Sequence, residues 1–294
     1  MINKGLSRLG IGFLYLLSLL PFWMLYLISD LLFVIIYYLI GYRRKVVQEN
    51  LANSFPERSE QEQRDIERKF YHYLCDLMVE TVKMITISQK AVAKRLSSPN
   101  GQLMFDYFAE GRSVIGAVGH YCNWEMGNLG LSAYFNATLL VVYKPLSNKV
   151  FDDFFIKVRS RFGSILIAMK NTTRAMVRHK DDVTLSLLVA DQTPAKHEAF
   201  YFTEFLDQQT AFFLGIEKLA KLTDQVVVFC DVKRLKRGYY EYTFIPITEN
   251  PKQTAEYEIT NNYIKCLEEM IRRTPQYWLW SHRRWKFKPE DKRK

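Results

Sequence analysis

Several features that would point to a particular class of function are missing from this chain of 294 residues. Its four cysteines lie far apart without metal-ligand spacing, so they predict no metal site, and we expect reduced thiols in a protein that faces the cytosol. The chain also has no glycine-rich phosphate loop, internal repeat or low-complexity linker. We therefore expect neither a bound metal nor a resident cofactor.

Excess charge is missing from the middle of the chain. The formal net charge is +10, but residues 1–48 carry +4 and residues 283–294 carry +5, which leaves +1 for everything between them. A nucleic-acid groove would spread basic residues across the body of the domain, so nucleic acid is not expected as a partner. Basic ends favour a membrane surface instead, where anionic lipid attracts each Lys or Arg by about 1 kcal/mol.

Charged residues are absent from Leu9 to Ser29, and a second apolar stretch follows Asp30 and runs to Ile40. The first stretch reaches the roughly 20 residues needed to cross a bilayer, and it is too long for a signal peptide. Pro21 and Asp30 interrupt the run and positive residues flank both ends, so a span and a shallow hairpin both fit the pattern. We expect a membrane anchor over residues 1–42 and a globular domain over residues 43–294.

The body of the chain alternates strands and helices. Ser59 and Glu62 form a capping-box pattern that predicts the start of a helix. We expect strands over residues 114–118, 138–143, 164–168, 183–190, 225–232 and 239–245, and helices over residues 124–134, 150–162, 211–222 and 255–272. This order predicts an α/β fold with a mixed, mostly parallel sheet flanked by helices, whose last two strands are antiparallel neighbours.

The most informative motif places a histidine and a carboxylate five positions apart, His120 and Glu125. The apolar run before it predicts a buried strand that ends in a loop, where α/β sheets usually present their chemistry. A histidine there can take a proton from a hydroxyl at neutral pH if a partner orients its ring, and we expect Glu125 to be that partner. A loop histidine with no catalytic role is the alternative, and Cys122 is either a nucleophile or a small buried residue.

This motif, with Asn123 and Trp124 inside it, resembles that of the late acyltransferases of lipid A biosynthesis, a branch of the lysophospholipid acyltransferase superfamily. The resemblance covers nearly the whole chain, with similar segments at residues 41–44, 50–51, 54–57, 143–145, 159–161, 190–194, 275–280 and 282–285. Asp191-Gln192-Thr193 departs from the Asp-Gln-Asp or Asp-His-Asp that is common in the family.

The resemblance implies a glycerol-phosphate-acyltransferase-like fold, with residues 43–294 as the acyltransferase domain. It also implies transfer of a fatty acyl group from an acyl-carrier-protein thioester to a hydroxyl of a lipid A precursor, at the cytoplasmic face of the bacterial inner membrane. Acyl carrier protein, the lipid A precursor and the membrane are therefore the expected partners. His120 would act as general base, which contributes roughly 10²–10⁴-fold, and Glu125 would stabilise the imidazolium that forms.

Five further residues are expected to bind substrate: Asn123, Arg159, Arg161, Asp191 and Gln192. The two arginines match phosphate or carboxylate groups, although a solvated basic helix end gives the same pattern. Asp191 and Gln192 either orient a sugar hydroxyl or cap a strand end, and Asn123 is one candidate donor to a developing oxyanion.

The closing segment is rich in Trp, Tyr and Arg, and we expect it at the lipid interface. A core contact by Trp278 or Trp280 is the other interpretation, and both can hold at once. His282 in the same segment is a weaker catalytic candidate because no acid is near it in the sequence.

Two other functions fit the same residues. One keeps the chemistry and changes the acceptor to a lysophospholipid or an amino-acid-containing lipid. The other is a non-catalytic protein that binds a membrane surface on an acyltransferase scaffold.

Overall fold

The computed structural model describes residues 4–135 and 137–290; Lys292, Arg293 and Lys294 of the basic C-terminal end lie outside the described residues. The chain begins with a series of helices before its first strand. These are α1 (Lys4–Leu19), α2 (Phe22–Phe33), the π-helix η1 (Val34–Ile40), α3 (Arg44–Ser54), α4 (Glu60–Lys83) and α5 (Gln89–Ala93).

The core is a seven-stranded sheet with the order β1-β9-β8-β2-β5-β3-β4. Its strands are β1 (Leu96–Ser97), β2 (Val114–Val118), β3 (Thr138–Tyr143), β4 (Ile165–Ala168), β5 (Thr184–Val189), β8 (Val226–Lys236) and β9 (Tyr239–Thr248). Every pairing is parallel except that of β8 with β9. The predicted mixed, mostly parallel sheet and its antiparallel final pair are therefore confirmed.

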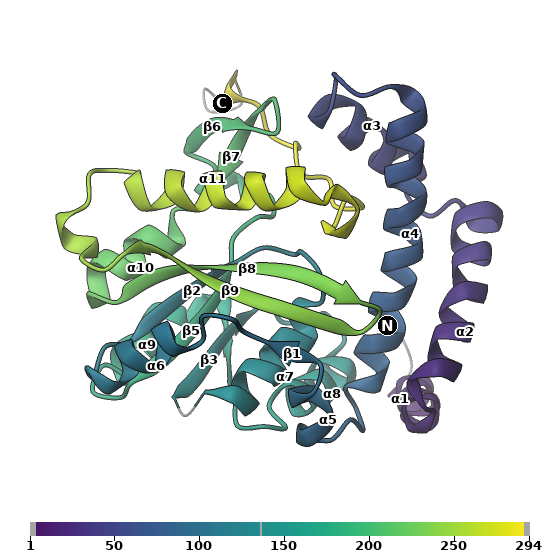
Figure 1. The fold of residues 1–294 in the computed structure, drawn as a ribbon, viewed down its shortest axis with the longest axis horizontal. Helices are drawn as coiled ribbons and strands as arrows, with labels where there is room; N and C mark the ends of the chain where they lie inside the picture. Colours follow the sequence, from purple (N-terminus) through teal and green to yellow (C-terminus); the bar gives the residue numbers. More distant parts are fainter. Residues whose placement is uncertain (1–3, 136, 291–294) are drawn as a thin grey trace.

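Helices cover both faces of this sheet (Figure 1). They are α6 (Gln102–Ala109), α7 (Trp124–Tyr134), α8 (Lys149–Arg159), α9 (Thr172–Arg178), α10 (Gly215–Thr223) and α11 (Glu258–Arg273). In Figure 1, α11 crosses one face of the sheet, and α4 stands beside the β8–β9 turn with α2 outside it. The helix α4 thus separates the N-terminal apolar segment from the sheet.

One predicted helix begins later than the sequence pattern indicates. Residues 211–222 were expected to be helical, but β6 (Tyr201–Phe205) and β7 (Gln208–Phe212) form a separate antiparallel hairpin, and α10 starts at Gly215. Phe205 and Phe212 are fully buried and their rings meet edge to face at 5.2 Å. This tertiary contact overrides the weak helical pattern at the start of the segment. The Ser59–Glu62 capping box is confirmed, with both reciprocal hydrogen bonds formed.

The N-terminal apolar segment is helical. Phe22–Ile40, which joins α2 and η1, is long and apolar enough to cross a membrane by length and composition, with a mean hydropathy of 2.0 over its window. Gly41 ends η1 in the left-handed region at φ 63°, a conformation that favours glycine. The chain then turns back into α3 and α4.

Candidate active site

The carboxyl end of β2 carries His120. All five residues of β2 are buried, and β2 lies between β5 and β8 at the centre of the sheet. Gly119 follows the strand at a close approach, because a Cβ there would lie 2.7 Å from Cδ1 of Leu267. His120 therefore lies at the carboxyl end of the central strand, directly after a position that has no room for a side chain.

A buried carboxylate, Asp191, orients the His120 ring. Asp191 follows β5, and the β2–β5 register pairs Val118 with Val189, which brings His120 and Asp191 level. The ring Nδ1 lies 2.6 Å from Oδ1 of Asp191, and the backbone N–H of His120 donates to Oδ2 at 2.8 Å. The indole N–H of Trp278 also donates to Oδ2 at 2.8 Å. Asp191 is only 1% exposed, so these donors must replace its hydration.

Asp191 is held ionised by its partners. Burial alone would raise the pKa of this carboxyl, but the His120 charge and the hydrogen bonds from His120 and Trp278 hold the pKa below its usual value. A carboxylate only accepts hydrogen bonds, so the His120 proton sits on Nδ1. The lone pair of a neutral ring is then on Nε2, which lies 3.3 Å from the side-chain amide nitrogen of Gln192. Nε2 is therefore the basic nitrogen of this partly buried ring.

The expected pairing of His120 with Glu125 is corrected by the structure. Glu125 lies in the first turn of α7 and forms a two-point ion pair with Arg159 at the end of α8, with one contact of 2.7 Å between Nε and Oε2. Burial opposes the charge on Arg159, and the hydrogen bonds to Glu125 nevertheless raise its pKa. Glu125 is thus committed to a guanidinium, whereas Asp191 reaches the ring because the ends of β2 and β5 are adjacent.

Asn123 is also placed differently from its expected role as a substrate contact. It is fully buried, its Oδ1 accepts the backbone N–H of Met126 as the N-cap of α7, and its Nδ2 donates to Glu80 at 2.7 Å. Tyr240 donates to the same Glu80 oxygen at 2.7 Å. Asn123 therefore fixes the loop between His120 and α7 rather than facing a ligand.

The remaining motif residues differ in accessibility. Arg161 is exposed and donates through Nη1 to the Met84 carbonyl. Cys122 is fully buried, and burial raises the pKa of its thiol well above the usual value. A nucleophilic thiolate is disfavoured there, and Cys122 is a small buried residue.

The closing segment pairs with the motif loop. The backbone N–H of Cys122 donates to the Tyr277 carbonyl at 3.0 Å, and that of Leu279 donates to the His120 carbonyl at 3.1 Å. Trp278 is 3% exposed and Trp280 is fully buried, so the lipid-interface interpretation is wrong for these two and the core alternative is confirmed. The sequence signal for the role of Trp278 was only its place in the closing motif.

The residues after Asp191 anchor the same segment. The Thr193 hydroxyl donates toward the Arg284 carbonyl at 2.6 Å, and the Thr193 backbone N–H donates to Nε2 of His282 at 3.2 Å. Burial, with the nearby charge of Arg284, lowers the pKa of His282 to about 4. His282 is thus a neutral acceptor at pH 7, and the family departure at Thr193 has a structural role.

A small apolar pocket lies between α4 and the closing segment, and two of its lining residues, Trp124 and Trp278, contact His120 and Asp191. Trp124, whose ring meets that of His120 at 5.0 Å, forms one wall, and Trp278 forms another. The other lining residues come from α4 and the closing segment: Phe70, Tyr73, Leu74, Leu77, Tyr277 and Leu279. The pocket is too small to hold a hydrocarbon chain, and through Trp124 it places an apolar surface near the candidate general base His120.

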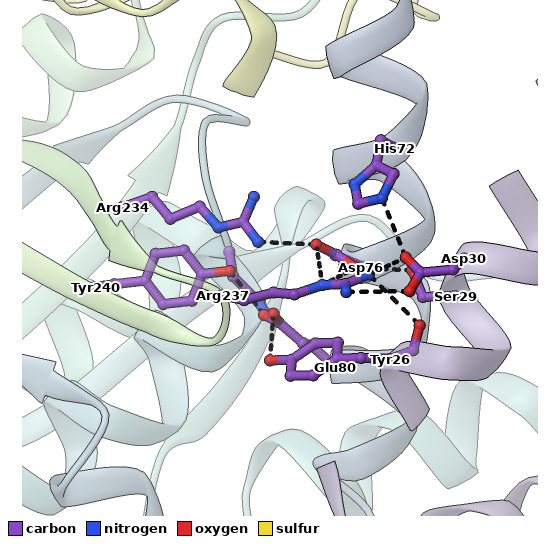
Figure 2. Close-up of polar contacts among 10 residues, drawn as sticks. Tyr26, Ser29, Asp30, His72, Asp76, Glu80, Arg234, Arg237 and Tyr240 are labelled. Atoms are coloured by element: carbon purple, nitrogen blue, oxygen red, sulfur yellow. Dashed lines mark hydrogen bonds and ion pairs between the residues drawn. The ribbon is translucent and has the colours of Figure 1, made fainter. Parts of the chain in front are cut away.

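One group of residues has the spacing of metal ligands. Single ligand atoms of Asp30, His72 and Asp76 lie within 4.8 Å of one another, which is the arrangement closest to a metal site that the described residues contain. Arg237 donates to both carboxylates, with Nη2 2.6 Å from Asp30 Oδ1 and Nε 2.8 Å from Asp76 Oδ1 (Figure 2). A guanidinium therefore already supplies the positive charge that these carboxylates need.

Comparison with known proteins identifies the family. A family model described as "Bacterial lipid A biosynthesis acyltransferase" matches residues 1–287. The chain belongs to this family. As a lipid A acyltransferase family member it is similar to a lipid A biosynthesis acyltransferase of Haemophilus influenzae, with 24% identity over 92% of this chain and 85% of the relative. It is also similar to two proteins of Escherichia coli strain K12, a lipid A biosynthesis lauroyltransferase and a lipid A biosynthesis palmitoleoyltransferase. Their identities are 24% and 23%, each over 97% of this chain and 92% of the relative.

Family membership makes the chain an O-acyltransferase. The relatives' names differ in the acyl group, lauroyl in one and palmitoleoyl in the other.

Proposed function

We propose that the chain moves a fatty acyl group from an acyl-carrier-protein thioester to a hydroxyl of a lipid A precursor, at the cytoplasmic face of the bacterial inner membrane. The observation that carries the chemistry is the buried carboxylate on Nδ1 of His120, which puts the basic lone pair on Nε2, next to the side-chain amide of Gln192. Family membership supports the lipid A acceptor.

In this mechanism Nε2 of His120 takes the proton of the acceptor hydroxyl as its oxygen attacks the thioester carbonyl carbon. The tetrahedral intermediate then collapses, the carbon–sulfur bond breaks, and the imidazolium returns the proton to the departing thiolate. Asp191 offsets the positive charge of the ring during both steps, as the aspartate of a serine-protease triad does. The acceptor attacks directly, so no enzyme nucleophile is needed.

Glu125 and Arg159 act on the loop in this proposal. Their ion pair ties the first turn of α7 to the end of α8, and Asn123 caps the same turn. Both contacts hold the segment that carries His120. Exposed Arg161 is the candidate for binding a phosphate or carboxylate of the substrate, because the guanidinium of Arg159 is already paired.

The test is acyl transfer by the purified full-length protein with acyl-carrier-protein thioesters and a lipid A precursor, followed by mass spectrometry of the product. His120→Ala should lower turnover by roughly 10²–10⁴-fold because the general base is lost. His179→Ala is a matched control, since His179 also contacts an aspartate through Nδ1, at 2.7 Å, and its side chain is 22% exposed against 21% for His120.

Turnover near the wild-type level in folded His120→Ala would remove the mechanism. Wild-type activity on a lysophospholipid or amino-acid-containing lipid, with none on the lipid A precursor, would keep the base and replace the acceptor. The absence of thioester consumption with every acceptor would favour a membrane-binding role.

A further inference from the structure

The N-terminal segment has an apolar outer surface. Of the 24 large apolar side chains that are exposed among the described residues, 14 lie between Leu6 and Tyr42. Trp23, Leu27 and Leu31 follow one stripe of α2 at helical spacing and are 64%, 61% and 61% exposed. A contiguous surface of this kind marks a binding face rather than ordinary surface scatter.

The turn that leads into α2 is held by a charged residue of α4. Nζ of Lys83 donates to the carbonyl oxygens of Ser18 and Leu20, each at 2.8 Å. Lys83 of α4 thus provides hydrogen bonds to two carbonyl groups that the ends of α1 and α2 leave without a helical partner.

The middle of α2 is held by a polar network (Figure 2). Ser29 donates to Asp76 of α4 at 2.7 Å, and Asp30 pairs with Arg237 of the β8–β9 turn at 2.6 Å. One turn earlier, Tyr26 donates to Glu80 at 3.0 Å. Asp30 is the ninth of the 19 residues from Phe22 to Ile40, so a helix that crossed a bilayer would carry this carboxylate near the midplane.

The end of the segment is held in the same way. The Tyr71 hydroxyl of α4 donates to the Tyr42 carbonyl at 2.5 Å, and Arg44 pairs with Glu67 of α4 at 2.7 Å. The part of the chain from Ser18 to Arg44 is therefore tied to α4 at three places. In turn, α4 contacts the catalytic loop through Glu80 and Asn123.

A helix that crosses a bilayer needs lipid or another apolar helix on every side. If α2 crossed the bilayer while it stayed packed on α4, then α4 and its charged residues would also lie in the hydrocarbon. The neighbouring end of the β8–β9 pair would lie there too. Detachment of α2 would instead leave Asp30 in the middle of the lipid without Arg237, which is costly.

We propose that α1, α2 and η1 do not cross the membrane but lie along it, docking their outer apolar face into one leaflet of an anionic bilayer while the polar network holds their inner face on the catalytic domain. Exposed Lys4, Arg8, Arg43 and Lys45 at the two ends of the segment supply the charge that such a leaflet attracts. This inference rests on the membrane attachment proposed above and not on the acyl-transfer chemistry.

Spin-label depth measurements test this arrangement. Trp23→Cys, Leu27→Cys and Leu31→Cys are each labelled in the full-length protein with Cys266→Ser, because Cys75, Cys122 and Cys230 are buried. The proteins are bound to phosphatidylethanolamine–phosphatidylglycerol vesicles, and oxygen and nickel-chelate accessibility reports the depth of each label. Leu222→Cys on α10, 59% exposed and on the far side of the molecule from α2 (Figure 1), is the aqueous control.

The three labels should lie at one shallow depth, roughly 5–10 Å below the headgroups. A crossing helix would instead change the depth by roughly 12 Å from residue 23 to residue 31, since the rise is 1.5 Å per residue, and that result overturns the proposal. Labels as exposed to water as Leu222→Cys overturn it too. The readout needs no turnover, so an inactive enzyme and a misplaced anchor give separate failures.

Discussion

Asp191→Asn is the substitution that most sharply separates the two carboxylates near His120. The side chain keeps its size but loses its charge, and its new amide N–H faces either Nδ1 of His120 or the N–H groups that Asp191 now accepts. If the amide donates to Nδ1, the ring proton moves to Nε2 and the base is blocked. If the amide oxygen stays on Nδ1, the imidazolium still loses its anionic partner.

Either outcome should lower turnover by roughly 10²–10⁴-fold, or about 3–5 kcal/mol of transition-state stabilisation at 1.36 kcal/mol per factor of ten. The free energy of unfolding should fall by about 1–3 kcal/mol, because a buried network of charge-assisted hydrogen bonds is broken. The assay is single-turnover acyl transfer, with the unfolding midpoint measured on the same preparations.

Asp182→Asn is the matched control, since Asp182 contacts Nδ1 of His179 at 2.7 Å on the surface. Trp278→Phe is a control for general disruption of the site. It removes one hydrogen-bond donor to Asp191 but leaves the Asp191 carboxylate in contact with His120. Turnover within about threefold of the wild type in folded Asp191→Asn would refute this role of Asp191. A loss of activity in Trp278→Phe as large as that in Asp191→Asn would refute it too.

Two further predictions concern the surroundings of the site. Gly119→Ala should lower the free energy of unfolding by about 1–3 kcal/mol in denaturant titrations, because its Cβ would lie 2.7 Å from Leu267. Gly215→Ala is the control and should change the free energy of unfolding little, because nothing lies within 4 Å of that Cβ. Equal effects of the two substitutions would contradict the close packing at Gly119. The folded pKa of His282 is about 4, below its unfolded value of about 6.5, so only the unfolded state gains a proton as the pH falls through 6.5. The wild type should therefore lose about 1 kcal/mol more stability than His282→Gln between pH 7 and pH 5, a figure discounted for the partial exposure of the ring. Parallel stability profiles against pH in the two proteins would contradict a neutral His282.

Much of the fold was readable from local sequence patterns. The strands expected over residues 114–118 and 138–143 have those bounds in the structure, and the Ser59–Glu62 capping box starts α4. These features depend on neighbours in the chain. The hairpin β6–β7 was missed because its register depends on burial of Phe205 and Phe212, a contact that the local pattern does not contain.

In the candidate site, too, features set by neighbours in the chain could be predicted and long-range contacts could not. His120 could be predicted because a histidine followed a buried strand, and Asp191 was recognised as a strand-end residue. Its partnership with His120 could not be read, because it requires β2 and β5 to be neighbours although β3 and β4 lie between them in the chain. Glu125 was the nearer acid in sequence, but the end of α8 brings Arg159 to it.

Trp278 illustrates the limit for long-range contacts. Its indole N–H reaches Asp191 from 87 positions away, through a closing segment that pairs with the motif loop. Composition alone favoured a lipid interface for such a tryptophan, since amphipathic rings are common there. Only the folded chain shows that its polar edge is used inside the protein.

The proposed mechanism requires that His120 carries its proton on Nδ1 and offers Nε2 as the base. Nitrogen-15 NMR of histidine-labelled protein at a pH where the ring is neutral tests it directly, with the His120 signals assigned by their loss in His120→Gln. A protonated, pyrrole-type Nδ1 and an unprotonated, pyridine-type Nε2 are predicted, and in Asp191→Asn this preference should weaken or reverse. A wild-type ring protonated on Nε2 would contradict the account.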